Sequence, residues 1–262
     1  MNNHDYQTLK NWFLAYTKDF LSNAHADREN ILLKKAHTLR VCSNMSKICT
    51  DLTSNEQIIA LTCALLHDVG RFEQLKQYGT FSDFKSEDHA SLGVRILNEL
   101  GVLDGLPANE KHLIITAIEN HNKAQIETGL SAQTVQLCNL LRDADKLDIW
   151  RVVIGYYEKR LEQENPTVVH NLPAGKDVSI DIYNTLINQD IVSFTMLETV
   201  VDLKVVQMGW IYDINTSKAL SLVIERGYLE AIYQTLPETE RINKLYHMMQ
   251  KYLSDQSQSL LD

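Results

Sequence analysis

The sequence predicts an all-α protein. Its 262 residues include only four prolines and ten glycines, and the first proline is Pro107. Because proline and glycine mark turns, this scarcity favours long helices over a sheet that needs many turns. Apolar residues recur at intervals of three and four along most of the chain, which is the period of an amphipathic helix. We therefore expect a helical bundle with a C-terminal helical extension.

Two helices open the chain. Aromatic and apolar residues at helical spacing predict a packing helix over residues 5–21. Asp27 is a candidate N-cap for a second helix, which is predicted to run to about residue 51. The apolar face of this helix carries His37. A lone histidine on such a face is more often a core residue than a metal ligand, so His37 needs support from other residues.

A third predicted helix leads to the most informative stretch of the sequence. Capping residues at 53–54 and acidic or amide side chains at 56–57 predict a capping box at its start. The apolar run that follows ends in the pair His67-Asp68. A buried carboxylate is costly unless it has a partner such as a cation. The pair alone is a weak signal in a chain with nine histidines, so the other candidate ligands decide its meaning.

Residues 69–86 lose the helical period and are rich in aromatic residues. We interpret this segment as the irregular border of a site, where Arg71, Tyr78 and Phe81 are candidates for ligand contacts. A packed connector is an equal alternative. The choice depends on whether a site forms beside His67 and its neighbour.

Three further helices carry polar residues at matching places. A predicted cap at Ser86 begins a helix with His89 on its apolar side. The next helix opens at Pro107, and its inward face ends at His121. A third helix begins near residue 131 and places Asp145 one turn after an apolar position.

The remaining chain is also predicted to be helical. Residues 162–176 contain two prolines and a glycine, and they predict a loop between subregions. Helical spacing returns over residues 194–252, and the polar end at 254–259 is expected to fray. We expect three parts: a packing helix over 1–24, a metal-binding helical core over 25–162, and a helical region over 163–262 that packs on the core as one unit.

Composition narrows the class of protein. Hydrophobic residues make up 44% and charged residues 23%, which is ordinary for a soluble globular protein. The formal net charge of -9 argues against general binding to a nucleic-acid backbone. Residues 1–20 lack a signal-peptide core, and no apolar run approaches the roughly 20 residues that span a bilayer. We therefore expect a cytoplasmic protein with no membrane segment.

The pattern of the four cysteines also agrees with a cytoplasmic protein. They show no CxxC spacing and lie within apolar helical patterns. We therefore expect buried, reduced thiols rather than disulfides or metal ligands. These residues are Cys42, Cys49, Cys63 and Cys138.

Six candidate metal ligands lie on, or at the end of, apolar helix faces. Apart from the adjacent pair, each is carried by a different predicted helix. Imidazole and carboxylate groups without thiolate suit Mn, Fe, Co, Ni, Zn or Mg, as one ion or two. The six residues are His37, His67, Asp68, His89, His121 and Asp145. The other histidines lack this context and are expected to be structural or exposed: His4, His25, His112, His170 and His247.

The order of these residues resembles that of the HD-domain metal-dependent phosphohydrolases. The resemblance spans roughly residues 25–160. It rests on four short sequence motifs: His37 with Val41, Leu65-Leu66-His67-Asp68-Val69-Gly70-Arg71, Asp88-His89-Ala90 with Gly93, and Asp143-Ala144-Asp145-Lys146-Leu147-Asp148.

The resemblance implies a ligand set. One metal is expected to be held by His37, His67, Asp68 and Asp145. Members with two further histidines between the His-Asp pair and the late aspartate often hold a second metal. Here these would be His89 and His121, with Asp68 as the bridge.

The chain departs from two branches of that family. The mononuclear nucleotidase branch usually has a glutamate three or four residues after the His-Asp pair, where this chain has Arg71 and Phe72. The cyclic-dinucleotide branch usually has paired histidines where this chain has His121-Asn122, and its glycine-tyrosine-proline motif is missing. The subfamily therefore stays open.

The expected chemistry is metal-dependent hydrolysis of a phosphate ester in a nucleotide or other small phosphorylated molecule. Asp68 and Arg71 are the candidate catalytic residues, and Arg71 and Lys146 are candidates for phosphate binding. The alternative for either cation is an ordinary surface or helix-end charge. A di-iron oxygenase of the same fold and a non-catalytic sensory domain are the alternative functions. The sequence leaves the oligomeric state open.

Overall fold

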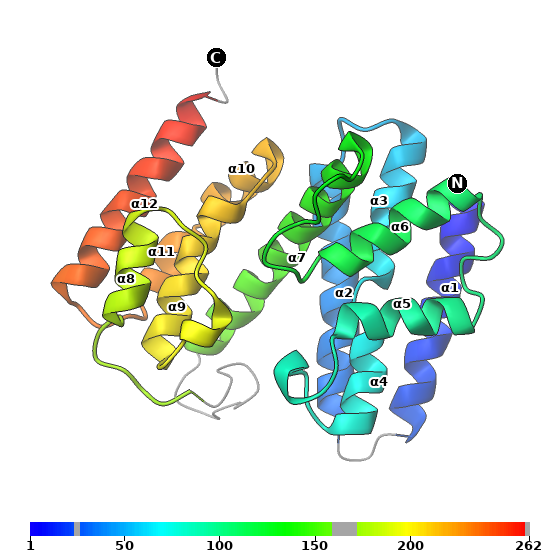
Figure 1. The fold of residues 1–262 in the computed structure, drawn as a ribbon, viewed down its shortest axis with the longest axis horizontal. Coiled ribbons are helices and arrows are strands. Elements are labelled where there is room, and N and C mark those ends of the chain that lie inside the picture. The colour runs from blue at the N-terminus through cyan, green and yellow to red at the C-terminus, as the bar shows by residue number, and fades with distance from the viewer. Residues whose placement is uncertain (24–26, 159–171, 260–262) are drawn as a thin grey trace. The chain divides into compact units, whose positions relative to one another are not determined.

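The structure is a computed structural model, and it describes residues 1–23, 27–158 and 172–259 (Figure 1). All regular structure in these residues is helical, which confirms the predicted all-α class. None of the described helices is long and apolar enough to cross a membrane.

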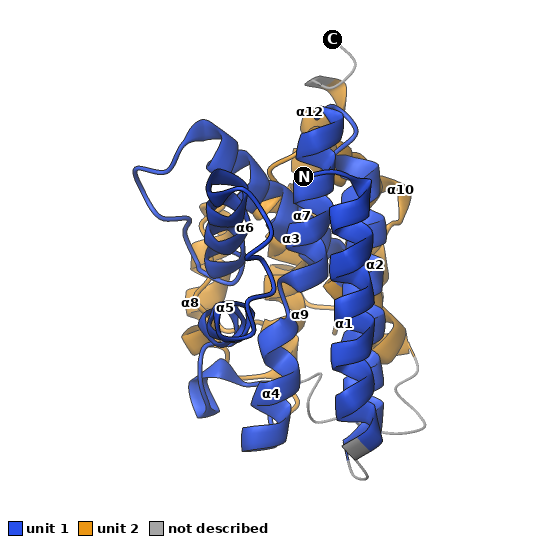
Figure 2. Cartoon of the chain, turned by 90° about the vertical axis from the view of Figure 1, so that its right-hand side faces the viewer, with its two compact units in different colours: residues 1–148 blue, residues 149–262 orange. Residues whose placement is uncertain are grey.

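The chain divides into two compact units, residues 1–148 and residues 149–262 (Figure 2). The long helix α7, Ala132–Glu158, contributes residues to both units. The domain boundaries expected at 24–25 and 162–163 lie outside the described residues. The division into three parts therefore stays a prediction.

Unit 1 is built around α3, which packs against α1, α2 and α6 (Figure 1). Nearly the whole second half of α3 is buried, so this helix forms the centre of the hydrophobic core. The helices of unit 1 besides α7 are α1 Asn3–Asn23, α2 Arg28–Ile48, α3 Ser54–Leu66, α4 Val69–Tyr78, α5 His89–Glu99 and α6 Ala108–Asn120, with a short 3-10 turn η1 at Asp83–Lys85.

The ends of α3 place the His-Asp pair. At its start, the Thr53 side chain accepts a hydrogen bond from the Glu56 backbone, and Glu56 accepts one from the Thr53 backbone, so the predicted capping box is confirmed. At its end, His67 is the C-cap residue of α3, and Asp68 is the N-cap residue of α4. The pair therefore lies at a junction between two helices, with both side chains buried.

The interpretation of residues 69–86 as irregular is wrong for the first ten of them, which form α4. The buried face of α4 includes Gly70 and Gln74, and neither residue marks an apolar face in a sequence pattern. The helix ends at Gly79, whose φ of 65° is in the left-handed region that suits glycine. The irregular part therefore begins only at that glycine.

The cap of α5 is also two residues away from its predicted place. Asp88, rather than Ser86, accepts a hydrogen bond at 2.7 Å from the backbone nitrogen of Ser91. The hydroxyl of Ser86 instead donates to the carbonyl of Ser82 and accepts from Gln74. Both residues are good caps in isolation, so local preference alone could not separate them.

Close contact between α4 and α5 requires glycine. A Cβ added at Gly70 would lie 2.2 Å from the carbonyl oxygen of His89 and 2.7 Å from the backbone nitrogen of Gly93. This contact fixes the start of α5 against the start of α4. It therefore sets the distance between the Asp68 and His89 side chains.

Gly70→Ala is expected to lower the free energy of unfolding by about 1–3 kcal/mol or more, because the added methyl group meets backbone atoms that cannot turn away. Thermal unfolding of the metal-free protein measures this loss. Gly105→Ala is the matched control, since a Cβ at Gly105 meets nothing within 4 Å. Equal melting temperatures for the two variants would mean that α4 and α5 can move apart without lowering the free energy of unfolding.

Unit 2 is built around α9, every residue of which is buried. This helix packs against α8, α11 and α12. Its polar side chains are hydrogen-bonded; Gln207, for example, accepts from the Tyr157 hydroxyl at 2.8 Å. The elements of unit 2 besides α7 are α8 Ile180–Ile187, η2 Phe194–Met196, α9 Val200–Gly209, η3 Trp210–Asp213, α10 Ser217–Glu225, α11 Tyr228–Tyr233 and α12 Glu240–Ser259.

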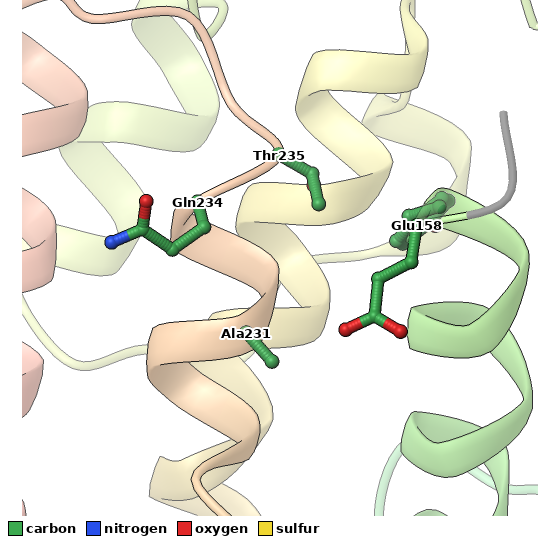
Figure 3. A pocket seen from close by; sticks show the side chains of 5 residues that line it. Glu158, Ala231, Gln234 and Thr235 are labelled. Atoms are coloured by element: carbon green, nitrogen blue, oxygen red, sulfur yellow. The ribbon is translucent and has the colours of Figure 1, made fainter. Parts of the chain in front are cut away.

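Unit 2 also has an open pocket between the end of α7 and α11 (Figure 3). Its lining holds a single carboxylate and no histidine, so it does not offer a set of metal ligands. None of the candidate site residues lines it. The lining residues are Tyr157, Glu158, Ala231, Gln234 and Thr235.

All four cysteines are buried and none of them forms a disulfide, as expected. Burial raises the pKa of Cys42 to about 12 and that of Cys138 to about 11. Because metals bind the thiolate form, these protonated side chains are poor ligands. The candidate metal ligands are therefore histidine and carboxylate groups.

Candidate metal centre

Five segments of unit 1 bring the six candidate ligands together. Their ligand atoms form three overlapping groups, and the atoms within each group lie within 4.8 Å of one another. All four histidines and Asp68 are buried, and Asp145 is partly buried. The groups are His37, His67 and Asp68; His67, His121 and Asp145; and Asp68, His89 and His121.

The first part of the cluster combines two imidazoles with two carboxylates. The Nε2 of His37 is 3.5 Å from Oδ2 of Asp68 and 3.0 Å from Oδ1 of Asp145. The Nε2 of His67 is 3.6 Å and 3.7 Å from the same two oxygens. Ligand atoms about 2.1 Å from a shared ion lie about 3.0–3.4 Å apart at octahedral or tetrahedral angles. The four atoms are therefore close to a coordination geometry.

The second part of the cluster is formed around Oδ1 of Asp68. The Nε2 of His89 is 3.4 Å from Oδ1 of Asp68 and 3.0 Å from the Nε2 of His121. Asp68 thus presents Oδ2 to His37 and His67 and presents Oδ1 to His89. This is the arrangement of a carboxylate that can bridge two ions.

The four imidazoles are held in the same tautomer. Each Nδ1 faces an oxygen that can only accept a hydrogen bond, so Nδ1 carries the proton and Nε2 of the neutral ring carries the lone pair. The pairs are His37 with Asp148 at 2.7 Å, His67 with the carbonyl of Ala64 at 2.9 Å, His89 with Asp83 at 2.7 Å, and His121 with the carbonyl of Ile118 at 2.7 Å.

Two features of these nitrogens fit a metal. The Nε2 of His67 is buried and has no hydrogen-bond partner, which is costly for a polar atom. The Nε2 atoms of His89 and His121 face each other at 3.0 Å with a lone pair on each. Burial lowers the pKa of both rings, and His89 further lowers that of His121, to about 3, so no proton separates the lone pairs at neutral pH. A bound cation would satisfy all three atoms.

The carboxylates are ionised and so available as ligands. Burial alone would raise the pKa of Asp68, but the charges of Lys34 and Arg71 hold it well below its usual value. Burial also opposes ionisation of Asp145, and its imidazole neighbours again hold the pKa well below the usual value. In the absence of a metal, nearby cationic side chains neutralise the negative charge of these carboxylates.

His37 supplies part of the positive charge that neutralises these carboxylates. Burial alone would lower its pKa, but the hydrogen bonds with Asp145 and Asp148 raise it to about 8. Without a metal, His37 is therefore protonated at neutral pH. Its second proton occupies the side of the ring that faces Asp68 and Asp145.

Three residues outside the predicted set support the cluster. Asp148 accepts from His37 and also from Nε and Nη2 of Arg40, at 2.6 Å and 2.9 Å. Asp83 accepts from His89, and Lys34 donates to Oδ2 of Asp68 at 2.8 Å. Helical spacing could have indicated Asp148, three residues after a predicted ligand, and Lys34, three residues before one. Asp83 lies in the connection before α5, where no periodic pattern applies.

Arg71 borders the cluster. Its Nε is buried without a hydrogen-bond partner and is 3.5 Å from Oδ1 of Asp68. Its Nη1 donates to Gln74, to the carbonyl of Phe81 and, at 2.8 Å, to Asp83. Arg71 therefore ties the connection between α4 and α5 to the cluster, and its predicted contact with a phosphate stays a prediction.

The remaining predicted residues are partly buried or exposed. Lys146 follows Asp145 in α7 and is partly buried, and its phosphate contact also stays a prediction. The ring of Phe81 lies beside Lys34, and Tyr78 is exposed at the end of α4. The other histidines are exposed at positions 4, 112 and 247, and those at 25 and 170 lie outside the described residues.

A comparison with protein families agrees with this geometry. The family model described as HD domain matches residues 35–150, a range that contains all six candidate ligands. No curated protein and no solved structure matches the chain. HD domains bind divalent metals and are generally metal-dependent phosphohydrolases. Residues 35–150 are therefore an HD domain, and this match is consistent with the HD-domain superfamily.

Proposed function

We propose that the protein hydrolyses phosphate ester bonds, in a metal-dependent reaction, in a nucleotide or another small phosphorylated molecule. The observation that carries the proposal is the convergence of four imidazole Nε2 atoms on Asp68 and Asp145. Such a set of buried nitrogen and oxygen atoms fits divalent metals. The family adds support, because its members generally act on phosphate bonds.

Each residue has a defined part in this proposal. The first ion would be held by His37, His67, Asp68 and Asp145, and the second by His89, His121 and Asp68. When bound, such ions lower the pKa of a water molecule enough to make it a nucleophile, and they offset charge on the phosphoryl group. Asp148 and Asp83 accept from Nδ1 of His37 and His89, and so keep both rings aimed at the cluster.

The cations beside the cluster are proposed to bind the substrate. Arg71 has an Nε free of hydrogen bonds and close to Asp68, so it can reach an anion held there. Lys146 is proposed to contact the same phosphate from α7. Cationic donors form the stronger class of hydrogen bonds with phosphate oxygens.

Arg71→Ala is expected to raise KM or lower kcat for a phosphate ester by about 10–100-fold, the size of one hydrogen bond to a charged group. Metal content should be unchanged, because the Asp83 carboxylate still accepts from His89. Lys76→Ala, an exposed charge on the same helix, is the control. Unchanged kinetics in the Arg71 variant would limit Arg71 to holding the connection before α5.

A di-iron oxygenase is the second candidate function. The observation that favours it is the donor set itself, since four imidazoles and a bridging carboxylate also suit a pair of irons. This candidate expects two irons per chain and consumption of dioxygen without release of phosphate. A non-catalytic sensory domain with a vestigial site should have lost some of its metal ligands. This chain keeps a histidine or an aspartate at all six candidate positions.

The test is metal analysis of the purified protein, followed by assays of mononucleotides, cyclic nucleotides and sugar phosphates with added Mn. The proposal expects cleavage of at least one ester and loss of cleavage with a chelator. It is contradicted if no ester is cleaved with any of Mn, Fe, Co, Ni, Zn or Mg. Iron content with dioxygen uptake would then favour the oxygenase.

A further inference from the structure

Lys34 shares an oxygen with the proposed first metal. It lies in α2, three residues before His37 and one residue before the range that the HD family model matches. Its Nζ is 2.8 Å from Oδ2 of Asp68. The same oxygen faces Nε2 of His37 and Nε2 of His67. An ammonium group and the proposed ion thus have one carboxylate oxygen in common.

The two arginines next to the cluster are bound differently. Nε and Nη2 of Arg40 donate to Asp148, the carboxylate that faces Nδ1 of His37. The Nη1 of Arg71 donates to Asp83, which faces Nδ1 of His89 in the same way. Both arginines thus balance carboxylates that orient the imidazoles, and the Nε of Arg71 is 3.5 Å from Oδ1 of Asp68 without a hydrogen bond to it. Lys34, in contrast, hydrogen-bonds a carboxylate that is itself a proposed ligand.

A divalent ion changes the balance at Asp68. The Asp68 side chain is only 3% exposed, so its charge needs a close cation whether or not a metal is present. An ion bound at Oδ2 supplies that charge and repels an ammonium group a few ångströms away. The ammonium is not enclosed: the Lys34 side chain is 20% exposed, and Nζ is 5.4 Å from the centre of the Phe81 ring. It has a flexible stem and an open side toward which to move.

We propose that Lys34 exchanges partners on metal binding: it holds Asp68 in the metal-free protein and binds a phosphate oxygen of the substrate in the metal-loaded protein. The choice of phosphate rests on the proposed function. The exchange has two consequences. Lys34 competes with the metal for Asp68 and so weakens metal binding, and the metal-loaded protein needs Lys34 to bind phosphate tightly.

Two binding measurements without turnover test the exchange. Free Mn²⁺ is followed by electron paramagnetic resonance in a metal titration, and inorganic phosphate is titrated calorimetrically into the Mn²⁺-loaded protein. Lys34→Gln should bind Mn²⁺ several-fold more tightly and bind phosphate at least about tenfold more weakly. Lys34→Arg should keep phosphate binding, because the charge is retained. Lys35→Gln, on the adjacent lysine, is the matched control and should change neither value.

The opposite results overturn the exchange. If Lys34→Gln binds phosphate as the wild type does, Lys34 makes no phosphate contact. If it binds Mn²⁺ more weakly, Lys34 only supports the fold of the site; thermal unfolding of the metal-free variant shows whether it is folded. If the Mn²⁺-loaded wild type binds no phosphate, the exchange is also excluded. Failure of the proposed function is distinct: both dissociation constants then behave as expected while no ester is hydrolysed.

Discussion

Replacing Asp68 by alanine is expected to abolish metal binding and any hydrolysis of phosphate esters. The two oxygens of Asp68 face different imidazoles, so one substitution removes a ligand from both proposed ions. Lewis-acid stabilisation is worth several kcal/mol, and its loss corresponds to at least about a 10³-fold lower rate. Elemental analysis after dialysis and an assay of phosphate release measure the two effects. Full metal content and activity in Asp68→Ala would place the site elsewhere.

The same variant should stay helical and become less stable. Lys34 and the protonated His37 lose their shared counter-charge in a buried environment. Breaking a fully buried ion pair costs about 3–5 kcal/mol, and the cost here is smaller because Lys34 is partly exposed. Circular dichroism and thermal unfolding follow both properties. Asp104→Ala, which removes an exposed carboxylate of unit 1, is the control that should leave helicity, metal content and activity unchanged.

The sequence predicted the ligand positions because each of them ends or interrupts an apolar helix face. Helical periodicity assigns a residue to a buried face, and a polar residue on such a face needs a partner. His37 and Asp145 met this criterion on separate helices, and the resemblance supplied the order that joins them. The structure brings the six residues into one cluster, and their roles as ligands stay predictions.

The sequence could not supply the partners that orient the ligands. His37 and Asp148 are 111 residues apart, and Lys34 and Asp68 are 34 residues apart. Periodicity gives the face on which a side chain lies, but it does not give the acceptor that it meets on another helix. Asp83 was missed for a different reason, since it lies in a connection whose shape depends on hydrogen bonds from Arg71 and Gln74.

Packing that uses small or polar residues also escaped the sequence pattern. The helical period is not visible in the sequence at the start of α4, and its buried face contains Gly70 and Gln74. Gly70 is buried because the backbone of α5 occupies the position that a Cβ atom would take. Gln74 is buried because its amide donates to Asp83, to Ser86 and to the carbonyl of Glu87. Such reasons come from tertiary contacts and leave no mark in hydrophobic periodicity.

Two metal ions per chain are expected in the fully loaded protein. Nε2 of His89 and Nε2 of His121 lie 3.0 Å apart, and His89 also faces the Asp68 oxygen that the first ion does not use. These three ligands leave coordination positions for water and substrate. The sequence adds a second reason: Arg71 and Phe72 stand where the mononuclear branch places its water-activating glutamate. Paired ions of this type are typically about 3.5–4 Å apart, a distance that one carboxylate can bridge.

Titration with Mn²⁺ measures the number of ions directly. The wild type should bind two equivalents, and the double variant His89→Ala/His121→Ala should bind one, because His37, His67 and Asp145 keep their positions around the first ion. His112→Ala, at an exposed histidine of α6, is the control and should bind two. One equivalent in both the wild type and the double variant would exclude the second ion. His89 and His121 would then be assigned to the phosphate, as hydrogen-bond donors whose lowered pKa values the charge of the bound phosphate raises.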